Sequence, residues 1–230
     1  MDDPERRRGR VHNAEGAREA ILNAAEAVFA EHGFDGARVD AIAETAGYNK
    51  SLLFQYFGDK IGLYKAVIRR ADKEITEFEM RVLLPLLEDE TIASDARRFK
   101  IFLETMIGGL FDYLLDHPRL TRIIVWEQAE GWQTYAKFLT RANTRADIED
   151  ADQFRILLHK ASRAGLLRSD VDPIIQLIIA EQMCWSYLTS IPLYQILLAD
   201  EDLSTAEALA RAREYIVAFV VHGMMIDNEG

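Results

Sequence analysis

Cysteine and proline are scarce in this sequence of 230 residues, which contains one cysteine and five prolines. The single cysteine, Cys184, cannot form a disulfide within the chain, so nothing points to an oxidising compartment. The N-terminal residues lack the apolar core of a signal peptide, and no stretch approaches the roughly 20 consecutive apolar residues of a membrane helix. We therefore expect a cytoplasmic protein that does not associate with a membrane.

The sequence also lacks the patterns that build most enzyme active sites and metal centres. No glycine-rich phosphate loop follows a strand, and the five histidines are scattered without the spacing of metal ligands. Cys184 lies in an apolar run, where a cysteine is expected to pack rather than to react. The sequence therefore predicts a protein that is not an enzyme and that uses no cofactor or metal.

Signals for β-strands are nearly absent as well, because alternation of β-branched and polar residues is rare. Apolar residues recur instead at spacings of three and four, which is the pattern of amphipathic helices. Hydrophobic residues make up 49% of the chain, enough for a substantial core. Helices are predicted at residues 14–32, 39–46, 50–57, 60 to about 85, 95–116, 119–130, 133–142, 150–164, 173–190 and 205–225.

Basic residues are outnumbered by acidic ones, but unevenly along the chain. The whole sequence has 27 Lys and Arg against 38 Asp and Glu, whereas its first 70 residues have 11 of each kind. The excess of acid therefore lies after residue 70. Affinity for DNA depends on local Lys and Arg side chains that meet phosphates, so an acidic C-terminal part is compatible with DNA binding. The alternative is that these charged residues are ordinary solvated surface residues with no relation to DNA binding.

The first three predicted helices form a recognisable arrangement. Gly33 and Gly47 follow the first two helices at positions where helices end, and Asn49 is a good N-cap for the third. Two short helices joined by a tight glycine-containing turn and packed on a longer helix make a helix-turn-helix, whose second short helix enters the major groove of DNA. A small three-helix unit that never touches DNA is the alternative.

A dense motif runs through this region. It has a Gly-aromatic pair, a Val-x-x-Ile-Ala step, an Ala-Gly turn, and a Leu-aromatic-x-Tyr-Phe run followed three residues later by Lys. The residues are Gly33-Phe34, Val39, Ile42-Ala43, Ala46-Gly47, Leu53-Phe54-Gln55-Tyr56-Phe57 and Lys60. With this motif, the chain resembles the TetR family of bacterial regulators over roughly residues 17–64. The remainder is similar to the family only in length and helical character.

The resemblance implies an all-α fold with two domains. A flexible basic arm at residues 1–13 would precede an N-terminal three-helix helix-turn-helix DNA-binding domain at residues 14–60. A larger helical C-terminal domain at residues 61–230 would bind a small molecule and dimerise through its last two long helices. The arm would either follow an adjacent minor groove or remain a solvated tail.

The implied function is that of a ligand-responsive transcriptional regulator. We expect a repressor that binds a palindromic operator in double-stranded DNA as a homodimer and is released by a small-molecule effector. An activator of the same family is one alternative. A helical ligand-binding protein that does not bind DNA is another, and the residues of the third helix argue against it.

The third helix has two distinct faces. Leu53 and Phe57, four residues apart, are expected to face the first two helices. Four residues share the opposite face and are predicted to meet base edges: Lys50, Ser51, Phe54 and Gln55. Lysine can donate to guanine, glutamine can pair with adenine, and phenylalanine can contact a thymine methyl group. We call these four residues the recognition face; a solvated surface is the alternative.

Phosphate contacts are expected to frame the recognition face. The candidates are Arg38, Asn49, Tyr56 and Lys60. The sequence departs from the family's pattern at several contact positions, with Ala37-Arg38 where a Thr/Ser pair is usual, Ser51 where Gly is usual and Phe54 where the first Tyr is usual. These departures do not threaten the fold, but they prevent the operator sequence from being carried over.

A pocket for a mainly apolar or aromatic effector is expected between the fourth helix and the last two. The candidates are Phe102, Met106, Leu110, Trp126, Trp132, Tyr135, Phe138, Met183 and Tyr187. Core packing is the alternative for each. Gly108-Gly109 inside a helical pattern costs about 1 kcal/mol per glycine, so it predicts a kink or close packing there.

The last two helices each carry an apolar face. The final helix repeats apolar or small residues at helical spacing: Leu209, Ala212, Ile216, Phe219, Val220 and Gly223. The preceding helix carries Ile174, Leu177, Ile178, Met183 and Trp185. We expect these faces to build a four-helix interface about a two-fold axis, with burial inside one chain as the alternative.

Overall fold

The computed structural model describes residues 4–78, 89, 91–137 and 145–226. These residues are helical and contain no extended strand; an isolated antiparallel bridge joins Leu167 and Met225. The predicted all-α fold is confirmed. None of the described helices combines the length and the apolar character that a membrane crossing requires.

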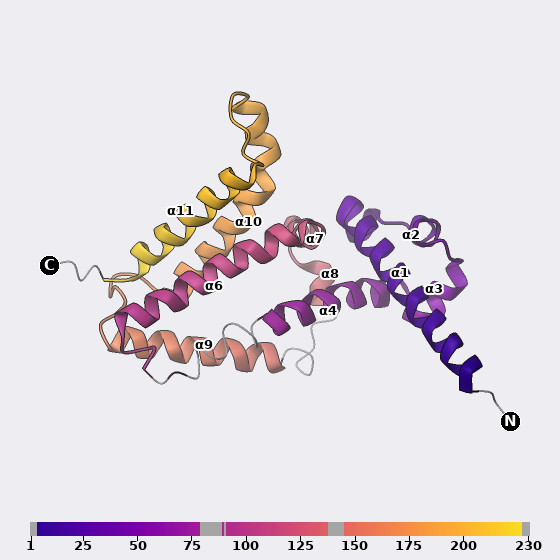
Figure 1. Ribbon diagram of the computed structural model, residues 1–230, viewed down its shortest axis with the longest axis horizontal. Helices are drawn as coiled ribbons and strands as arrows, with labels where there is room; N and C mark the ends of the chain where they lie inside the picture. The colour runs from indigo at the N-terminus through magenta and orange to yellow at the C-terminus, as the bar shows by residue number, and fades with distance from the viewer. Residues whose placement is uncertain (1–3, 79–88, 90, 138–144, 227–230) are drawn as a thin grey trace. The chain divides into compact units, whose positions relative to one another are not determined.

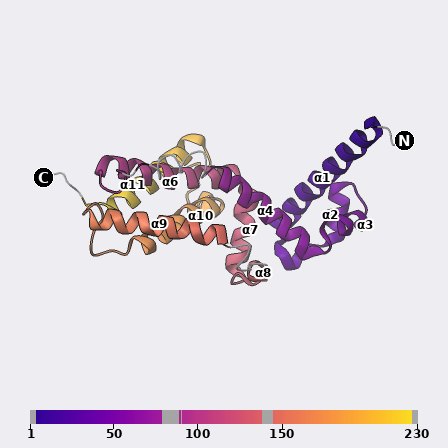
Figure 2. The same ribbon diagram turned by 90° about the horizontal axis from the view of Figure 1, so that it is seen from below.

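The chain divides into two compact units (Figures 1 and 2). The first unit comprises residues 1–74 and 119–138, and the second comprises residues 75–118 and 139–230. The helices of the first unit are α1 (Pro4–Gly36), α2 (Val39–Ala46), α3 (Lys50–Phe57), most of α4 (Lys60–Phe78), α7 (Pro118–Ala129) and α8 (Gln133–Ala136). Those of the second are α6 (Ala96–Asp116), α9 (Arg145–Arg163), α10 (Pro173–Leu197) and α11 (Ala206–Met224).

The predicted bounds of α2 and α3 are confirmed, but the ends of four other helices are not where the sequence placed them. α9 begins at Arg145 instead of residue 150, and α8 ends at Ala136 instead of residue 142. α1 begins at Pro4 instead of residue 14, so the basic residues assigned to an arm lie within the helix. Proline suits a first helical turn, and the Arg- and Glu-rich residues after it favour a helix. α10 continues to Leu197 across Pro192, because one interior proline costs a helix a hydrogen bond without forcing it to end.

The sequence predicted that the first helix ends before Gly33, and α1 has a kink at this residue. Gly33 has φ 68° and ψ −179°, which no helical residue adopts. The indole ring of Trp126 on α7 lies against this glycine, and an added Cβ would approach it to 3.1 Å. The Trp126 Nε1–H also donates to the carbonyl oxygen of Ala30 at 3.2 Å. Glycine therefore lets α7 pack directly on the kink.

Aromatic residues form the centre of the first unit. The Tyr64 ring of α4 meets the rings of Phe29 and Phe34 edge-on, with centroids 4.9 and 5.1 Å away. The Tyr64 hydroxyl donates to the buried Glu127 carboxylate of α7 at 2.7 Å. The second Glu127 oxygen accepts from the Tyr135 backbone N–H at 3.1 Å. α4, α7 and α8 are thus joined around one buried carboxylate.

The second unit is a helical bundle in which α6 contacts both α10 and α11. Phe102 of α6 is buried between Phe99 and Phe154, with ring centroids 6.0 and 5.8 Å away. The buried Gly108 faces the Arg213 guanidinium of α11, so this glycine allows close packing, one of the two outcomes predicted for it. Arg213 Nε also lies 2.7 Å from Asp112 Oδ1, which fixes α11 against α6.

Candidate nucleic-acid interface

The orientation of α3 is set by its caps and by one buried side chain. Asn49 Oδ1 accepts a hydrogen bond from the Leu52 backbone N–H at 2.9 Å, which is the N-cap that the sequence predicted. Gly47, with φ 72°, ends α2 two residues earlier and lets the chain turn sharply. Leu53 is buried, so one side of α3 is held in the core of the first unit.

The four residues of the recognition face are exposed together on the other side of α3. Phe54, the aromatic member of this face, is 40% exposed. Lys50 Nζ lies 3.0 Å from Asp40 Oδ1 of α2, and both side chains are exposed. Such a pair is weak in water, so the lysine can exchange its carboxylate for another acceptor. The predicted separation of buried and exposed faces is present.

The residues predicted to contact phosphate differ in their exposure and in the contacts that they make. Arg38 is exposed at the start of α2, where its side chain makes no cap hydrogen bond. Tyr56 is half-buried near the end of α3. Lys60 Nζ lies 4.7 Å above the Phe34 ring and donates to the Asp35 carbonyl oxygen at 3.3 Å. Burial lowers the pKa of Lys60, and the neighbouring Asp35 carboxylate opposes that effect.

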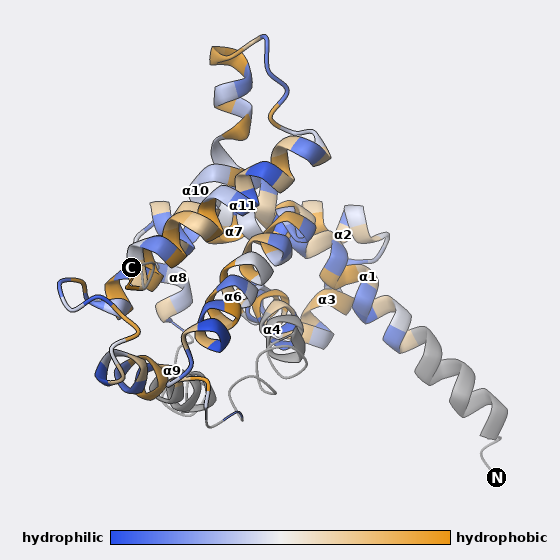
Figure 3. Cartoon of the chain, turned by 60° about the vertical axis from the view of Figure 1, so that its left-hand side comes forward, coloured by the Kyte–Doolittle hydropathy of each residue, from blue (hydrophilic) through white to orange (hydrophobic). Residues whose placement is uncertain are grey.

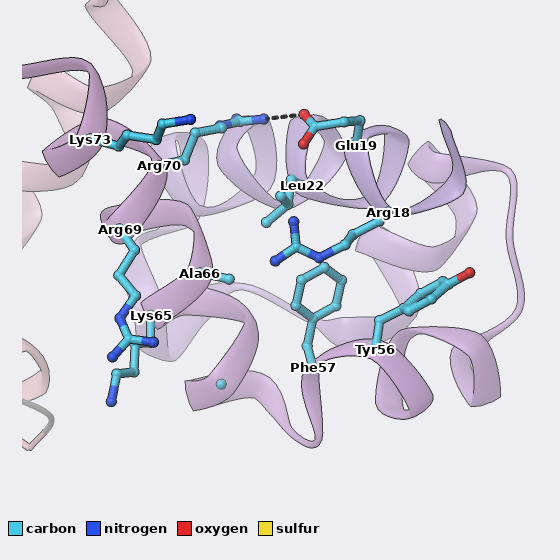
Figure 4. Close-up of a pocket in the computed structure, with 11 residues that line it drawn as sticks. Arg18, Glu19, Leu22, Tyr56, Phe57, Lys65, Ala66, Arg69, Arg70 and Lys73 are labelled. Carbon is cyan, nitrogen blue, oxygen red and sulfur yellow. Dashed lines mark hydrogen bonds and ion pairs between the residues drawn. The ribbon is translucent and has the colours of Figure 1, made fainter. Parts of the chain in front are cut away.

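A basic hollow of about 530 Å³ lies between α1, α3 and α4, and sequence reasoning did not identify it (Figure 4). Its charged lining residues are Arg18, Glu19, Lys65, Arg69, Arg70 and Lys73. Tyr56 and Phe57 of α3 also line it, and Arg18 stacks over the Phe57 ring at 5.4 Å. The available signal was the spacing of four between Lys65, Arg69 and Lys73, which puts them on one face of α4.

The residues predicted to line an effector pocket are divided between the two units. Five belong to the second unit, where Phe102 is buried and the others are half-buried: Phe102, Met106, Leu110, Met183 and Tyr187. Trp126, Trp132 and Tyr135 belong to the first unit, and Trp126 contacts α1 there. Phe138 lies outside the described residues. The Tyr187 ring lies tilted against that of Phe111, with ring centroids 6.2 Å apart.

Two family models match the chain. The model of "Bacterial regulatory proteins, tetR family" matches residues 21–67, and that of "Tetracyclin repressor-like, C-terminal domain" matches residues 102–220. The first match covers the helix-turn-helix and the beginning of α4. The second covers more than half of the chain and runs from α6 into α11.

Some of the curated proteins that the chain resembles are described as repressors. The chain is 33% identical over 120 residues to the HTH-type transcriptional repressor SCO4008 of Streptomyces coelicolor, an alignment that covers 52% of this chain and 54% of that protein. It is 24% identical over 216 residues to the HTH-type transcriptional repressor NicS of Pseudomonas putida, covering 94% and 95% of the two chains. The chain therefore spans about half of the first relative and nearly all of the second.

Solved structures agree with this fold. The transcriptional regulator SCO4942 of Streptomyces coelicolor superposes with a TM-score of 0.58 at 26% identity, over 90% of this chain and 98% of that one. The ketosteroid regulator KstR2 of Mycobacterium tuberculosis has a TM-score of 0.64 over 91% and 95%, and at 17% identity it supports the fold alone.

The exposed recognition face on an anchored α3 and the larger helical second unit define a helix-turn-helix transcriptional regulator. With both family models matched, the chain belongs to the TetR family. Members of this family regulate transcription and are not enzymes, which agrees with the absence of catalytic motifs from the sequence.

Proposed function

We propose that this protein is a repressor that binds a palindromic operator as a homodimer and is released by a small effector. The observation that carries the proposal is the recognition face, four exposed side chains of mixed chemistry on a helix whose other side is buried. Relatives described as repressors support the direction of regulation. The protein would act in the cytoplasm, where bacterial DNA lies.

Base contacts are assigned to the recognition face. Lys50 would leave Asp40 and donate to guanine, Gln55 would pair with adenine, and Phe54 would contact a thymine methyl group. Ser51 would donate to or accept from either kind of base edge. Because the Lys50–Asp40 pair is exposed, breaking it costs little, about 0–1 kcal/mol.

Phosphate contacts are assigned to Arg38, Asn49, Tyr56 and Lys60. Arg38 stands at the start of α2, where backbone N–H groups and the helix dipole also favour an anion. Packing over Phe34 holds Lys60 in a fixed position at the start of α4. Asn49 would contact phosphate through its amide nitrogen, since its Oδ1 is used as the cap of α3.

Dimerisation is assigned to exposed apolar residues of α10 and α11 (Figure 3). The exposed large side chains of these helices include Ile175, Ile178, Ile179, Leu193, Tyr194, Ile196, Leu197, Tyr215 and Phe219. α10 and α11 contact each other, so one chain presents a two-helix surface. A second copy placed about a two-fold axis would complete a four-helix interface.

The effector is expected to be mainly apolar or aromatic. Phe102, Met106, Leu110, Met183 and Tyr187 would supply such a lining in the second unit, and Trp126, Trp132, Tyr135 and Phe138 are the remaining candidates. The backbone of α4 continues from the first unit into the second at residue 75, so a ligand-dependent change can be transmitted along this helix. Altered spacing of the two α3 helices would then no longer match half-sites about 34–36 Å apart.

Selection of bound duplexes from a random pool tests this function. The expected result is a palindrome, because a symmetric dimer reads two equal half-sites. A pool that yields no specific sequence at moderate salt would overturn the proposal. Addition of apolar candidate effectors to the same binding assay should release the selected duplex.

Substitutions of the proposed phosphate contacts test the assigned residues. Tyr56→Phe and Lys60→Ala should each weaken binding to the selected duplex by about 10-fold, corresponding to roughly 1.4 kcal/mol for the removal of one charge-assisted hydrogen bond. Lys100→Ala on α6, an exposed lysine of the second unit, is the matched control and should bind like the wild type. Unchanged binding by both variants would refute the assignment of these two residues.

A further inference from the structure

α7 contacts α1 at the point where the helix is interrupted. Gly33 has ψ −179°, and a break in a helix weakens the hydrogen bonding of the carbonyl groups in the preceding turn. The Trp126 Nε1–H donates to one of these carbonyl groups, that of Ala30, at 3.2 Å. The indole ring also covers Gly33, where an added Cβ would lie 3.1 Å from the Trp126 Cδ2 atom. Trp126 therefore supplies both a donor and a packing surface at the kink.

The kink leads directly into α2. The Gly33 carbonyl oxygen accepts a hydrogen bond from the Ala37 backbone N–H at 3.3 Å, and Ala37 is buried. Arg38, the next residue, is the N-cap of α2. α2 contacts both α1 and α3. The backbone geometry at Gly33 therefore determines where α2 begins and, through α2, how α3 is oriented.

The position of the indole is fixed by the residues that follow it. Glu127 is buried and accepts hydrogen bonds from the Tyr64 hydroxyl of α4 at 2.7 Å and from the Tyr135 backbone N–H at 3.1 Å. Lys137, at the end of α8, has its Nζ 5.8 Å from the ring centroid of Phe34, the residue after Gly33. These contacts attach α7 and α8 to α4 and to the kink.

The contacts of Trp126 assign it to the first unit. It is among the candidates for an effector pocket, yet its ring and its Nε1–H are both used against α1. A ligand could reach neither without moving the indole away from the kink. Residues 119–138 pack with the helix-turn-helix, although they lie within the match to the C-terminal family model.

We propose that Trp126 is a positioning residue for operator binding, because its indole holds the kink of α1 in the geometry that orients α2 and α3. Trp126 acts through Gly33 and does not itself contact DNA. The inference rests on the proposed operator binding and adds to it a residue of α7, which the helix-turn-helix motif does not include.

Trp126→Phe is the test variant, because it removes the Nε1–H donor and keeps an aromatic ring. It should bind the selected operator about 10-fold more weakly than the wild type, since the loss of one hydrogen bond and of part of the packing disturbs the orientation of α3. Its affinity for a scrambled duplex of the same length and composition should be unchanged, because non-specific binding depends on charge and not on an exact orientation of α3.

The matched control is Ile21→Val, which shortens a fully buried side chain of α1 about three turns before the kink. This substitution lowers stability by an amount comparable to the loss of one hydrogen bond. It should bind the operator and the scrambled duplex like the wild type. Thermal unfolding and helicity by circular dichroism confirm that both variants are folded at the temperature of the binding assay.

Amide hydrogen exchange of the DNA-free protein tests the kink directly. In Trp126→Phe, residues 33–38 should exchange faster than in the wild type, because the hydrogen bond from the Ala37 N–H to the Gly33 carbonyl is held less firmly. In Ile21→Val, the same segment should exchange at the wild-type rate.

Several results would overturn the inference while leaving operator binding intact. Wild-type affinity of Trp126→Phe for the operator would show that the indole does not position α3. An equal weakening on the operator and the scrambled duplex would indicate a direct contact with the DNA backbone, and an equal weakening in Ile21→Val would indicate an effect of stability alone. Unchanged exchange of residues 33–38 would show that the indole does not hold the kink. Failure of the wild type to bind any duplex would instead refute the proposed function.

Discussion

The buried Glu127 carboxylate of α7 is hydrogen-bonded to two other helices of the first unit. It is 1% exposed, and it accepts hydrogen bonds from the Tyr64 hydroxyl of α4 and the Tyr135 backbone N–H at the start of α8. Burying a charged group without hydrogen-bond partners costs free energy, and the two donors offset that cost for Glu127. The hydrogen bonds also tie together α4 and α7, the two helices at which the chain passes between its units.

Tyr64→Phe removes the hydroxyl donor and leaves the ring in place. We expect the free energy of unfolding to fall by about 1–3 kcal/mol, because a buried carboxylate oxygen loses its partner. Denaturant unfolding at neutral pH measures the loss. The matched control is Tyr215→Phe, since Tyr215 is 74% exposed and its hydroxyl lies in water. Equal stability of the Tyr64→Phe variant and the wild type would contradict the role of the Tyr64–Glu127 hydrogen bond.

Tyr64 also makes the free energy of unfolding depend on pH. Burial, with the Glu127 hydrogen bond and charge, raises the pKa of Tyr64 in the folded protein above its ordinary value of about 10. The stabilisation is therefore complete below about pH 10 and is lost as the pH rises beyond it, because the unfolded chain ionises first. The Tyr64→Phe variant should lack this component of the loss at alkaline pH.

At the scale of elements, the junction between α3 and α4 depends on Gly62. A Cβ added at this position would collide with the Phe57 carbonyl oxygen, a backbone atom that cannot rotate away. The Asp59 side chain caps α4 at the same place, accepting from the Gly62 N–H at 2.7 Å. The short connection between the two helices therefore requires close backbone approach, which positions α3 relative to α4.

Gly62→Ala should lower the free energy of unfolding by about 1–3 kcal/mol, because overpacking forces the two backbones apart. Binding to the selected operator should weaken as well, since α3 would be displaced. Gly16→Ala in α1 is the matched control: nothing lies within 4 Å of an added Cβ there, and helix propensity alone predicts a gain of about 0.5–1 kcal/mol. Thermal unfolding and gel shifts measure both effects, and a Gly62→Ala protein as stable as wild type would refute the close approach.

At the scale of the whole molecule, exposed apolar surface on α10 and α11 predicts self-association. Ile178 of α10 is 54% exposed, and Ile156 of α9 is 51% exposed, so the two residues form a matched pair. Ile178→Glu should convert the proposed dimer to a monomer, because a charge desolvated at the proposed interface would cost several kcal/mol. Ile156→Glu should leave the dimer intact.

Sedimentation velocity measures the oligomeric state of both variants. The monomeric variant should also lose operator affinity by orders of magnitude, because each half-site then binds alone. A wild-type protein that sediments as a monomer at micromolar concentration, or dimers formed equally by both variants, would contradict the proposed interface.

The sequence alone determined the local features of the first unit. The bounds of α2 and α3, the Asn49 cap, the break in helical backbone at Gly33 and the separation of Leu53 from the recognition face all follow from helical periodicity and cap chemistry. These depend on residues that are neighbours along the chain, and for that reason they could be read from it. Periodicity also placed α6 within one residue of its observed bounds.

Only the tertiary structure decided which apolar surfaces face each other. Ala212, Ile216 and Val220 of α11 are buried within the chain, whereas Phe219, predicted for the same interface, is 66% exposed. Periodicity shows that a helix has an apolar side, but it does not show which element covers it. Trp126 likewise packs on the kink of α1, and the basic hollow unites residues from three helices. Such contacts join residues far apart in sequence, so they exist only once the chain has folded.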